Sequence, residues 1–312
     1  MEEKLALSVI VTTKDRQSDL KRCVESIKRA VPKEIRWELI IVDDNSLDGT
    51  RDLTLTDLGI KKGRIIHNRQ TLMMVKSRNI GARSAGGREI LFIDDDNVLE
   101  KKMIEELLKA AVKNKKFGII GPSMCYLKSG KRYLDYQLIN LATGKTSAKV
   151  DESQNIINES DGIPNVFMIK REVFAKCGYF DEDIIQTYTE PDFTFRARKF
   201  GYQSVITKKA KTFHSVTEED NLSPRSLGGK FPQKAYCLIR NRFVIIKRYA
   251  KFPQKVVFLF FFSWFWPAAY SFMMIKYKRF DLIKYYWYGW KDGLKYLISS
   301  NLENSLPILS KK

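Results

Sequence analysis

The chain has 312 residues, enough to bury a sizeable core, so we expect one large domain with an appendage or two domains. Its four cysteines form no Cys-x-x-Cys pair and it has only two histidines, which excludes the usual zinc-site spacings and indicates reduced thiols. The formal net charge is +19, and the last 88 residues hold 17 Lys/Arg against 3 Asp/Glu. A tail this basic indicates an anionic partner, either a membrane surface or a nucleic acid.

Apolar runs alternate with helical patterns over the first third of the chain. The runs predict strands over Leu5–Val11, Trp37–Val42, Arg64–Ile66 and Ile90–Ile93. The helical patterns predict helices over Asp19–Ala30, Val75–Ala85 and Leu99–Val112, and Ser18 is expected to cap the first of them. A further helix is expected after the polar turn Asp43–Thr50. This alternation is typical of an α/β protein with a mostly parallel, Rossmann-like sheet and helices on both faces.

The second part of the chain is less regular. We predict strands over Phe117–Ile120, Val166–Ile169 and Thr212–Phe213, hairpins or a flap over Cys125–Val150, and a helix over Ala235–Tyr249. Another helix is expected to open at Thr189–Asp192, with Glu190 as its cap, Pro191 in the first helical position and Gly201 at its end.

Three of the predicted strands end in polar residues. The polar ends are Thr12 and Thr13, Asp43 and Asp44, and Asp94 to Asp96. In parallel α/β sheets ligands bind outside the carboxyl ends of the strands, so these side chains are expected to line one edge. Clustered carboxylates suit Mg²⁺ or Mn²⁺, which carry substrate phosphates as well. The alternative is a solvated turn whose acids cap the following helix.

Four segments in the first hundred residues resemble the family 2 glycosyltransferases, which have the GT-A fold. They are Ser8–Thr13, Val42–Thr50, Arg78–Gly87 and the Asp-x-Asp motif Asp94–Asp96. Gly178–Glu182 is similar to a signature in the second half of the family. The resemblance implies transfer of a sugar from a nucleotide diphosphate to an acceptor, with inversion at the anomeric carbon, and a need for Mg²⁺ or Mn²⁺.

The resemblance also implies roles for particular residues. Its donor-binding positions correspond here to Thr13, Asp15, Asp44, Arg78, Asp94 and Asp95. Its metal positions correspond to Asp94, Asp96 and His214. A single histidine is as often structural, so the ligand role of His214 depends on the resemblance alone.

The catalytic base of the family corresponds to Glu190 or Asp192. Counted back from Gly201, Asp192 keeps its expected place, but Glu190 stands where the family usually has Asp. Glutamate can act as a base, although its longer side chain changes the distance to the acceptor. The alternative is that both acids only stabilise the helix N-terminus, whose dipole favours the ionised form and weakens a base. Both residues therefore stay candidates.

The tail carries two further candidate features. Arg240 and Arg242 could hold a diphosphate or a lipid phosphate, or could belong to a basic helix face. Val256–Ile275 has 20 residues without a charge, about the length that spans a bilayer. Its flanks are equally basic, Pro267 lies near its middle, and Phe280–Ser299 resembles a helix in the membrane interface. These features favour a re-entrant or in-plane anchor over a kinked helix that crosses the membrane.

We therefore predict a GT-A catalytic domain over residues 1–224 and a basic, aromatic, helical membrane-associated tail over residues 225–312. The expected function is inverting transfer from a nucleotide diphosphate sugar to a hydroxyl or phosphate on a lipid-linked carrier. The catalytic domain is expected on the cytoplasmic side of the cell membrane, with no nucleic-acid partner. A metal-dependent nucleotidyltransferase and a non-catalytic nucleic-acid-binding protein are the alternatives.

Overall fold

The computed structural model describes residues 5–216, 227–228 and 232–299, and the chain divides into two compact units. The first unit comprises Met1–Leu138, Ala148–Phe180 and Phe193–Val216, and the second comprises Ile139–Ser147, Asp181–Asp192 and Thr217–Lys312. The predicted domain boundary at residue 224 lies outside the described residues. Two short segments from the first two thirds of the chain thus belong to the second unit, which sequence order alone did not indicate.

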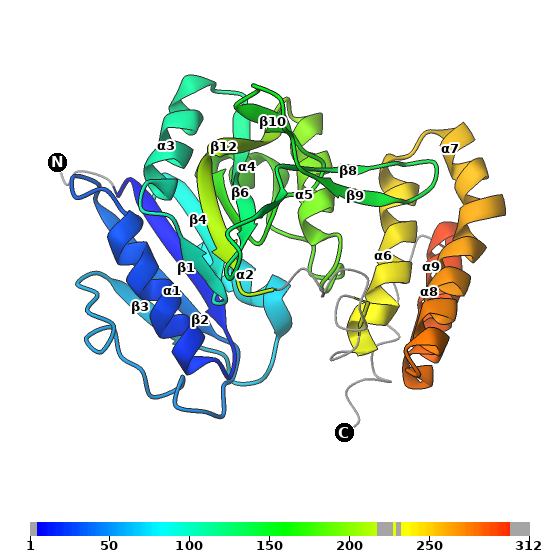
Figure 1. Ribbon diagram of the computed structural model, residues 1–312, viewed down its shortest axis with the longest axis horizontal. Helices are drawn as coiled ribbons and strands as arrows, with labels where there is room; N and C mark the ends of the chain where they lie inside the picture. The colour runs from blue at the N-terminus through cyan, green and yellow to red at the C-terminus, as the bar shows by residue number, and fades with distance from the viewer. Residues whose placement is uncertain (1–4, 217–226, 229–231, 300–312) are drawn as a thin grey trace. The chain divides into compact units, whose positions relative to one another are not determined.

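The first unit is built on one mixed sheet with the strand order β10-β12-β6-β11-β4-β1-β2-β3, and β5 and β7 pair with β12 and β6 (Figure 1). Its strands are β1 (Leu7–Thr13), β2 (Trp37–Asp43), β3 (Gly63–His67), β4 (Glu89–Asp94), β5 (Asn97–Leu99), β6 (Phe117–Tyr126), β7 (Arg132–Leu134), β10 (Ile157–Glu159), β11 (Val166–Lys170) and β12 (Gln203–His214). Strands β4, β1, β2 and β3 are parallel, as are β6 and β12, whereas β11 is antiparallel to both of its neighbours. The predicted mostly parallel α/β architecture is confirmed.

Helices cover both faces of this sheet, which explains why its central strands are continuous apolar runs. The helices of this unit are α1 (Gln17–Ala30), α2 (Met73–Ser84), α3 (Met103–Lys113), α4 (Arg171–Cys177) and the greater part of α5 (Thr189–Lys199). Val9 and Val11 of β1 belong to one buried core with residues of α1 and α3, whereas Ile10 belongs to a second core with residues of α2, α4 and α5. The side chains of one strand alternate between the two cores, as the period of a strand requires.

Two helix starts differ from the sequence predictions in this unit. Helix α1 begins at Gln17, so Ser18 lies inside it and is not its cap. The backbone N–H of Gln17 donates to Asp48 Oδ2 at 3.3 Å, so a distant loop satisfies the helix end. Helix α3 begins at Met103 because Asn97–Leu99 forms β5 and pairs with β12. Residues 51–62 form turns in place of the helix expected after Thr50.

Hairpin structure is confirmed in the region between Cys125 and Val150. Strands β8 (Tyr136–Ile139) and β9 (Thr146–Lys149) form a separate two-stranded sheet. The tip of this hairpin, Ile139–Ser147, belongs to the second unit.

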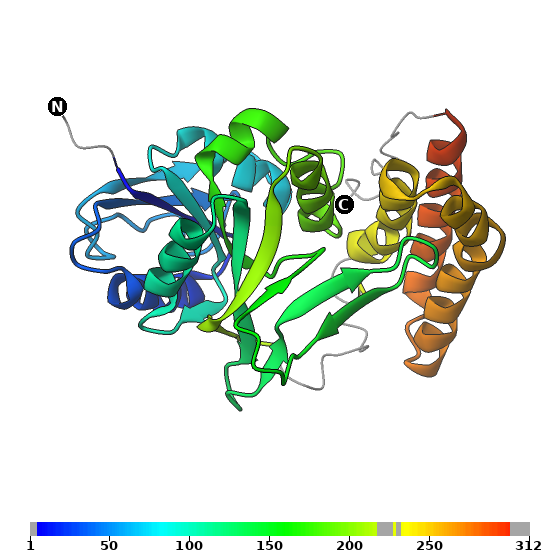
Figure 2. The same ribbon diagram turned by 90° about the horizontal axis from the view of Figure 1, so that it is seen from above.

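The second unit is a helical assembly. Its elements are α6 (Pro232–Tyr249), α7 (Phe252–Val257), the π-helical turn η2 (Phe258–Phe262), α8 (Ser263–Lys276), the 3-10 turn η3 (Phe280–Leu282) and α9 (Ile283–Ser299). Helices α6, α8 and α9 lie side by side (Figure 2). They share a core that includes Phe243, Phe258, Met274 and Tyr286. Gly289 allows the close approach of α9 to α6, since a Cβ there would lie 2.4 Å from the carbonyl oxygen of Tyr236.

One helical path runs from Phe252 to Lys276, and in the described part of the chain it is the one helix long and apolar enough to cross a membrane by length and composition. Pro267 lies inside α8 and does not break it, since a proline removes only one helical hydrogen bond. The helix therefore continues through this proline. The stripe expected to lie in the membrane interface, on α9, instead packs largely against the helices of this unit: Tyr286 is fully buried and Trp290 is partly buried in the shared core.

Candidate active site

The carboxyl ends of β1, β2 and β4 meet at one edge of the sheet. Thr12 of β1 is in register with Val42 of β2 and with Asp94 of β4, and Thr13 is in register with Asp43. The strand-end residues that the sequence analysis singled out are therefore neighbours. This edge is where ligands of open α/β sheets bind.

Asp95 is the buried member of the acidic triplet, with 3% of its surface exposed. Its Oδ2 accepts a hydrogen bond from the Thr13 hydroxyl at 2.7 Å, and its Oδ1 is 2.9 Å from Nη1 of Arg16. Burial raises the pKa of Asp95 to about 6, against the opposing effects of Arg16 and Thr13. Asp95 therefore fastens the segment after β1 to the end of β4.

Asp96 is more accessible and lies against His214, the last residue of β12. Its Oδ1 is 3.4 Å from His214 Nε2, and its Oδ2 is 3.2 Å from Arg16 Nη1. Burial alone would raise the pKa of Asp96, but the hydrogen bond and charge of His214 and the charge of Arg16 outweigh it and lower the pKa. The structure thus brings two of the three predicted metal ligands, Asp96 and His214, side by side.

Neighbouring side chains orient the imidazole of His214. Tyr133 Oη is 3.1 Å from Nδ1, and Asn165 Nδ2 is 3.3 Å from Nε2. Burial raises the pKa of Tyr133 far above its usual range, so its hydroxyl stays protonated. A partner on Nδ1 keeps Nε2 directed at Asp96, which is the arrangement found when imidazoles bind metals.

Asp94, the third predicted metal ligand, has a different partner. Its Oδ1 is 2.7 Å from Nη2 of Arg78, whose side chain is 1% exposed on α2. The guanidinium of Arg78 also lies 5.2 Å from the centre of the Phe167 ring. Among residues 5–216, 227–228 and 232–299, no group of three or more His, Cys, Asp or Glu side chains is arranged to hold a metal ion. Asp96 and His214 therefore form a two-residue candidate metal site, and Asp94 is turned towards Arg78.

Asp15 and Asp44 organise the loops around this edge. Asp15, at a φ of 51°, accepts a hydrogen bond from the N–H of Leu47 at 2.6 Å and connects the loops that follow β1 and β2. Asp44 accepts the N–H groups of Leu72 and Met73 at 2.7 and 2.8 Å, which satisfies the start of α2. Both predicted donor-binding acids thus shape the site through backbone contacts, and nucleoside binding by them stays a prediction.

Glu190 and Asp192, the candidate bases, lie in the second unit and differ in their surroundings. Helix α5 begins at Thr189, so Glu190 is its second residue and not its cap. Asp192 is fully buried, and its Oδ1 accepts hydrogen bonds from Arg248 Nη1 at 2.8 Å and from the Tyr249 hydroxyl at 2.7 Å. Glu190 is partly exposed.

Arg248 is central to this acidic cluster. Its Nη1 also lies 2.7 Å from Asp181 Oδ2, and its Nε donates to the Tyr296 hydroxyl at 3.2 Å. Burial by itself lowers the pKa of Arg248, but the charge of Asp192 and the hydrogen bonds that Arg248 donates to Tyr296, Asp192 and Asp181 raise it well above its usual value. Helices α6 and α9 therefore hold the start of α5 through one permanently charged side chain.

Arg240 and Arg242, predicted to contact a phosphate, are buried in the second unit at 1% and 3% exposure. Arg242 Nε donates to Gly144 O at 2.9 Å and to the Tyr188 hydroxyl at 3.1 Å, and its guanidinium lies 4.2 Å from the Trp266 ring centre. Arg240 donates to the carbonyl of Asp183. These contacts hold the hairpin tip and the segment before α5, and a phosphate contact stays a prediction.

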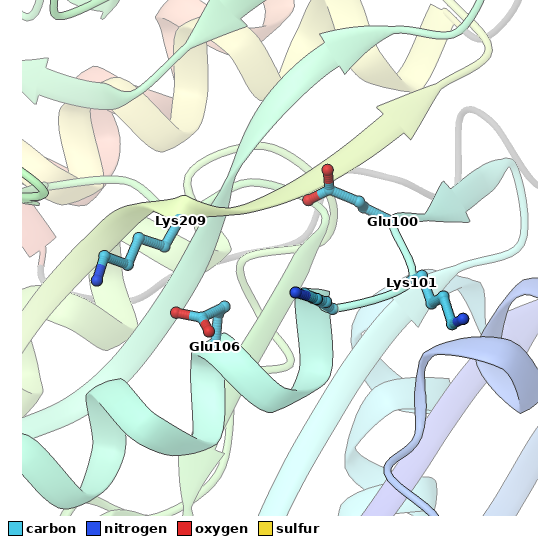
Figure 3. Close-up of a pocket in the computed structure, with 5 residues that line it drawn as sticks. Glu100, Lys101, Glu106 and Lys209 are labelled. Atoms are coloured by element: carbon cyan, nitrogen blue, oxygen red, sulfur yellow. The ribbon is translucent and has the colours of Figure 1, made fainter.

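A cavity of about 450 Å³ in the first unit contains none of the predicted site residues. Figure 3 shows its lining, which comes from the loop before α3, from α3 and from β12: Glu100, Lys101, Lys102, Glu106 and Lys209. Its side chains are charged and of both signs, and none is a predicted site residue, so we assign it no role.

The sequence analysis missed Arg16, Tyr133, Asn165 and Arg248. Arg16 had a signal, since a cation so near the end of β1 was certain to lie close to three carboxylates at the end of β4. The other three come from distant segments whose approach depends on the pairing of β12 and on the packing of α6, which no local pattern reports.

A mixed sheet with an acidic edge at the carboxyl ends of its strands fits the GT-A class of transferases. The family model described as Glycosyl transferase family 2 matches residues 8–178, more than half of the chain. The chain therefore belongs to this family and is a glycosyltransferase. This membership places it outside the two alternative classes, the nucleotidyltransferases and the non-catalytic nucleic-acid-binding proteins.

Individual relatives are distant. The chain is 24% identical over 215 residues to the dTDP-rhamnosyl transferase RfbF of Shigella flexneri, an alignment that covers 67% of this chain and 71% of RfbF. The structure of GalNAc-T7 with UDP, GalNAc and Mn²⁺ is similar with a TM-score of 0.59 and 16% identity over 87% of this chain and 58% of that protein. The S. aureus TarS 1-349 structure is similar with a TM-score of 0.53 and 16% identity over 93% and 92% of the two chains. The structural matches show the fold, and this chain spans less than two thirds of GalNAc-T7.

Proposed function

We propose that this glycosyltransferase moves a sugar, with inversion, from a nucleotide diphosphate sugar to a hydroxyl or phosphate on a lipid-linked carrier. The observation that carries the donor half is the edge formed by β1 and β4, where Asp96, His214 and Arg16 converge. The name of RfbF specifies a dTDP-sugar and the GalNAc-T7 structure holds UDP, which supports a nucleoside diphosphate as the leaving group.

The donor set at Asp96 and His214 fits Mn²⁺ or Mg²⁺. A carboxylate oxygen and an imidazole nitrogen 3.4 Å apart can share one cation, whose other ligands would be diphosphate oxygens and water. When bound, the ion supplies positive charge to the departing diphosphate. Mn²⁺ in the GalNAc-T7 structure supports this choice of ion. Arg16 adds a fixed cation beside the same carboxylate, and Arg78 holds Asp94 in place.

Glu190 is the proposed general base. Asp192 is fully buried and its Oδ1 already accepts two hydrogen bonds, whereas Glu190 is partly exposed two residues earlier on the same helix. In the proposed step, the carboxylate of Glu190 takes the proton of the acceptor hydroxyl. The acceptor oxygen forms a bond to the anomeric carbon, while the bond between the anomeric carbon and the diphosphate oxygen breaks on the opposite face. Asp192 then serves to hold the base segment.

The lipid-linked acceptor and the membrane location are proposed from the second unit. Its helix Phe252–Lys276 is long and apolar enough to cross a membrane by length and composition, and basic residues flank it on both sides. A membrane-associated enzyme meets an acceptor that is confined to the bilayer. We place the enzyme on the cytoplasmic face of the cell membrane, as a peripheral or re-entrant protein, where the surface is anionic.

A panel of nucleotide sugars tests this function. The purified protein is incubated with each donor and Mn²⁺ or Mg²⁺, and the released nucleotide is identified. We expect one donor to be hydrolysed slowly to a nucleoside diphosphate, and this nucleotide to be released faster when a polyprenyl phosphate in detergent is added to accept the sugar. Release of pyrophosphate, or no turnover of any donor, would contradict the proposal.

A further inference from the structure

The second unit presents an apolar face that no described side chain covers. It lies along α7, η2 and α8, and three of its side chains are among the most exposed in the unit: Phe260 is 70% exposed, Phe261 69% and Phe272 72%. The face consists of Val256, Phe260, Phe261, Trp264, Phe265, Phe272 and Ile275. A soluble protein rarely leaves so many large apolar side chains together in water, so the face requires a partner.

The opposite side of the same helical path is packed within the unit. Phe258, Ser263, Pro267 and Met274 are buried, and they recur at the spacing of one helix face. The ring centre of Phe258 lies 5.1 Å from that of Phe243 of α6, and the ring centre of Tyr270 lies 5.5 Å from that of Tyr286 of α9. The helix is therefore fixed to α6 and α9 along its length (Figure 2).

This packing decides the orientation in a membrane. A crossing α8 would draw α9 into the hydrocarbon beside it, and α9 exposes Lys284, Lys291 and Lys295 at intervals along its length. Three exposed ammonium groups at different depths along one helix cannot all lie near the bilayer surface if that helix crosses the membrane. A helix lying parallel to the surface avoids this, because only the face of α7, η2 and α8 then enters the lipid.

The charges at the ends of the face indicate the kind of surface. Lys251 and Lys255 precede the uncharged stretch, and Lys276, Lys278 and Arg279 follow it. A helix in the interface plane keeps both of these ends at the level of the headgroups, where cations are attracted to anionic lipids. A face that is apolar along its centre and basic at both ends therefore fits an anionic bilayer better than another protein surface.

We propose that the exposed face of α7, η2 and α8 docks in the plane of an anionic lipid bilayer, with the helix parallel to the surface and not across it. This inference rests on the membrane association proposed above and adds the docking surface and its orientation. The remainder of the second unit stays outside the hydrocarbon.

Vesicle binding of the full chain tests the surface. We expect flotation with phosphatidylcholine vesicles that contain phosphatidylglycerol and weaker flotation without it. A variant that combines Phe260→Ser, Phe261→Ser and Phe272→Ser should lose at least about a hundredfold in affinity for the vesicles, because three large apolar groups no longer leave water. The matched control is Phe200→Ser, which removes a phenylalanine that is 54% exposed in the first unit and should bind like the wild type.

Depth measurements test the orientation without removing the face. Single cysteines at Val256, Phe260, Trp264 and Ile275 are spin-labelled in a Cys177→Ser background, since Cys23, Cys125 and Cys237 are buried. Val256 and Ile275 are separated by about 28 Å along a helix. All four labels should be at one shallow depth. A depth profile in which Trp264 is near the midplane and the ends are near opposite surfaces would show a crossing helix and overturn the proposal.

Two other outcomes would also overturn it. Labels that stay in water in the presence of vesicles would exclude lipid as the partner, and self-association through this face would identify a second copy of the chain instead. Hydrolysis of the donor in detergent-free solution is measured in parallel. If the triple variant still hydrolyses the donor but no longer binds vesicles, the docking surface is required for membrane binding and not for the sugar chemistry, so the two proposals are tested independently.

Discussion

Two regions of the molecule share one arrangement of acids. In each, a buried carboxylate is held by an arginine and a hydroxyl group, and a nearby carboxylate is left more accessible. At the sheet edge Asp95 is held by Arg16 and Thr13, beside Asp96. At the start of α5, Asp192 is held by Arg248 and Tyr249, close to Glu190.

The regions differ in what surrounds the buried acid. The side chain of Arg16 is 43% exposed and that of Arg248 is 26% exposed. Burial raises the pKa of Asp95 to about 6, so this carboxyl group can take up a proton at modest cost. We propose that in each region the buried acid holds the backbone, while the accessible acid takes part in the reaction.

The largest expected effect comes from the accessible acid of the first region. Asp96→Ala should lower turnover by about a thousandfold or more, because the departing diphosphate loses a ligand for its counter-charge. Thermal unfolding should change little, since the fastening role belongs to Asp95. Turnover and unfolding are measured on the same preparation. Full activity in this variant, or in an excess of chelator, would refute the metal assignment.

The accessible acid of the second region should have the next largest effect. Glu190→Gln should lower turnover by ~10²-fold or more, the usual scale of general base catalysis, with donor binding nearly intact. Asp192→Asn is the paired control and should act mainly on stability. If Asp192→Asn folds normally but is inactive, while Glu190→Gln is near normal, the base has been assigned two residues too early.

The two arginines sharpen the comparison through stability. Arg248→Met leaves the 1% exposed side chain of Asp192 without its cation, and breaking such a pair costs about 3 kcal/mol. Arg16→Met should cost only about 1 kcal/mol, because Arg16 is more exposed and Asp95 can become protonated. Denaturant unfolding near neutral pH measures both. Equal losses in the two variants would show that the regions do not differ in this way.

The smallest effect is expected at Glu89, a buried acid at the opposite end of β4 that lacks such a clamp. Its one described ion-pair contact is with Arg88 Nε, at 3.9 Å, and burial raises its pKa. Because the pKa of Glu89 is higher in the folded state than in the unfolded state, its protonated form stabilises the fold. This stability is fully present below the unfolded-state pKa and is lost as the pH rises through the folded-state pKa. Glu89→Gln should therefore stabilise the protein by about 1 kcal/mol or less at pH above neutrality.

Below the ordinary carboxyl range this gain should disappear, since both proteins are then neutral at position 89. Unfolding followed across pH measures the difference. A gain that is constant with pH would mean that packing, and not ionisation, separates the two proteins.

The parallel half of the sheet was predictable because its signal is local. Strands β1, β2 and β4 are apolar runs that end in polar residues, and their register places those ends together. The start of α1 was not predictable, because the N–H of Gln17 is satisfied by Asp48, which is 31 residues distant. The second unit recruits Asp181–Asp192 from the middle of the chain by tertiary packing, which sequence order conceals.

For the candidate site, the sequence predicted where the acidic residues lie better than it predicted what each of them does. Asp94, Asp95 and Asp96 were predicted as one acidic cluster, but each has a different partner: Arg78, Thr13 with Arg16, and His214. Asp94 ends β4, whereas Asp95 and Asp96 form the turn before β5, so three identical acids in a row reach different environments. The distinction between Glu190 and Asp192 likewise depends on Arg248, which lies 56 residues from Asp192.

The central claim is that the two accessible acids have separate tasks. Equilibrium binding of the donor's nucleoside diphosphate in the presence of Mn²⁺, measured by calorimetry, tests it most directly on Asp96→Ala and Glu190→Gln. The account predicts that Asp96→Ala loses the metal-dependent part of this binding, while Glu190→Gln binds like the wild type. Wild-type affinity in Asp96→Ala, or loss of binding in Glu190→Gln, would contradict it.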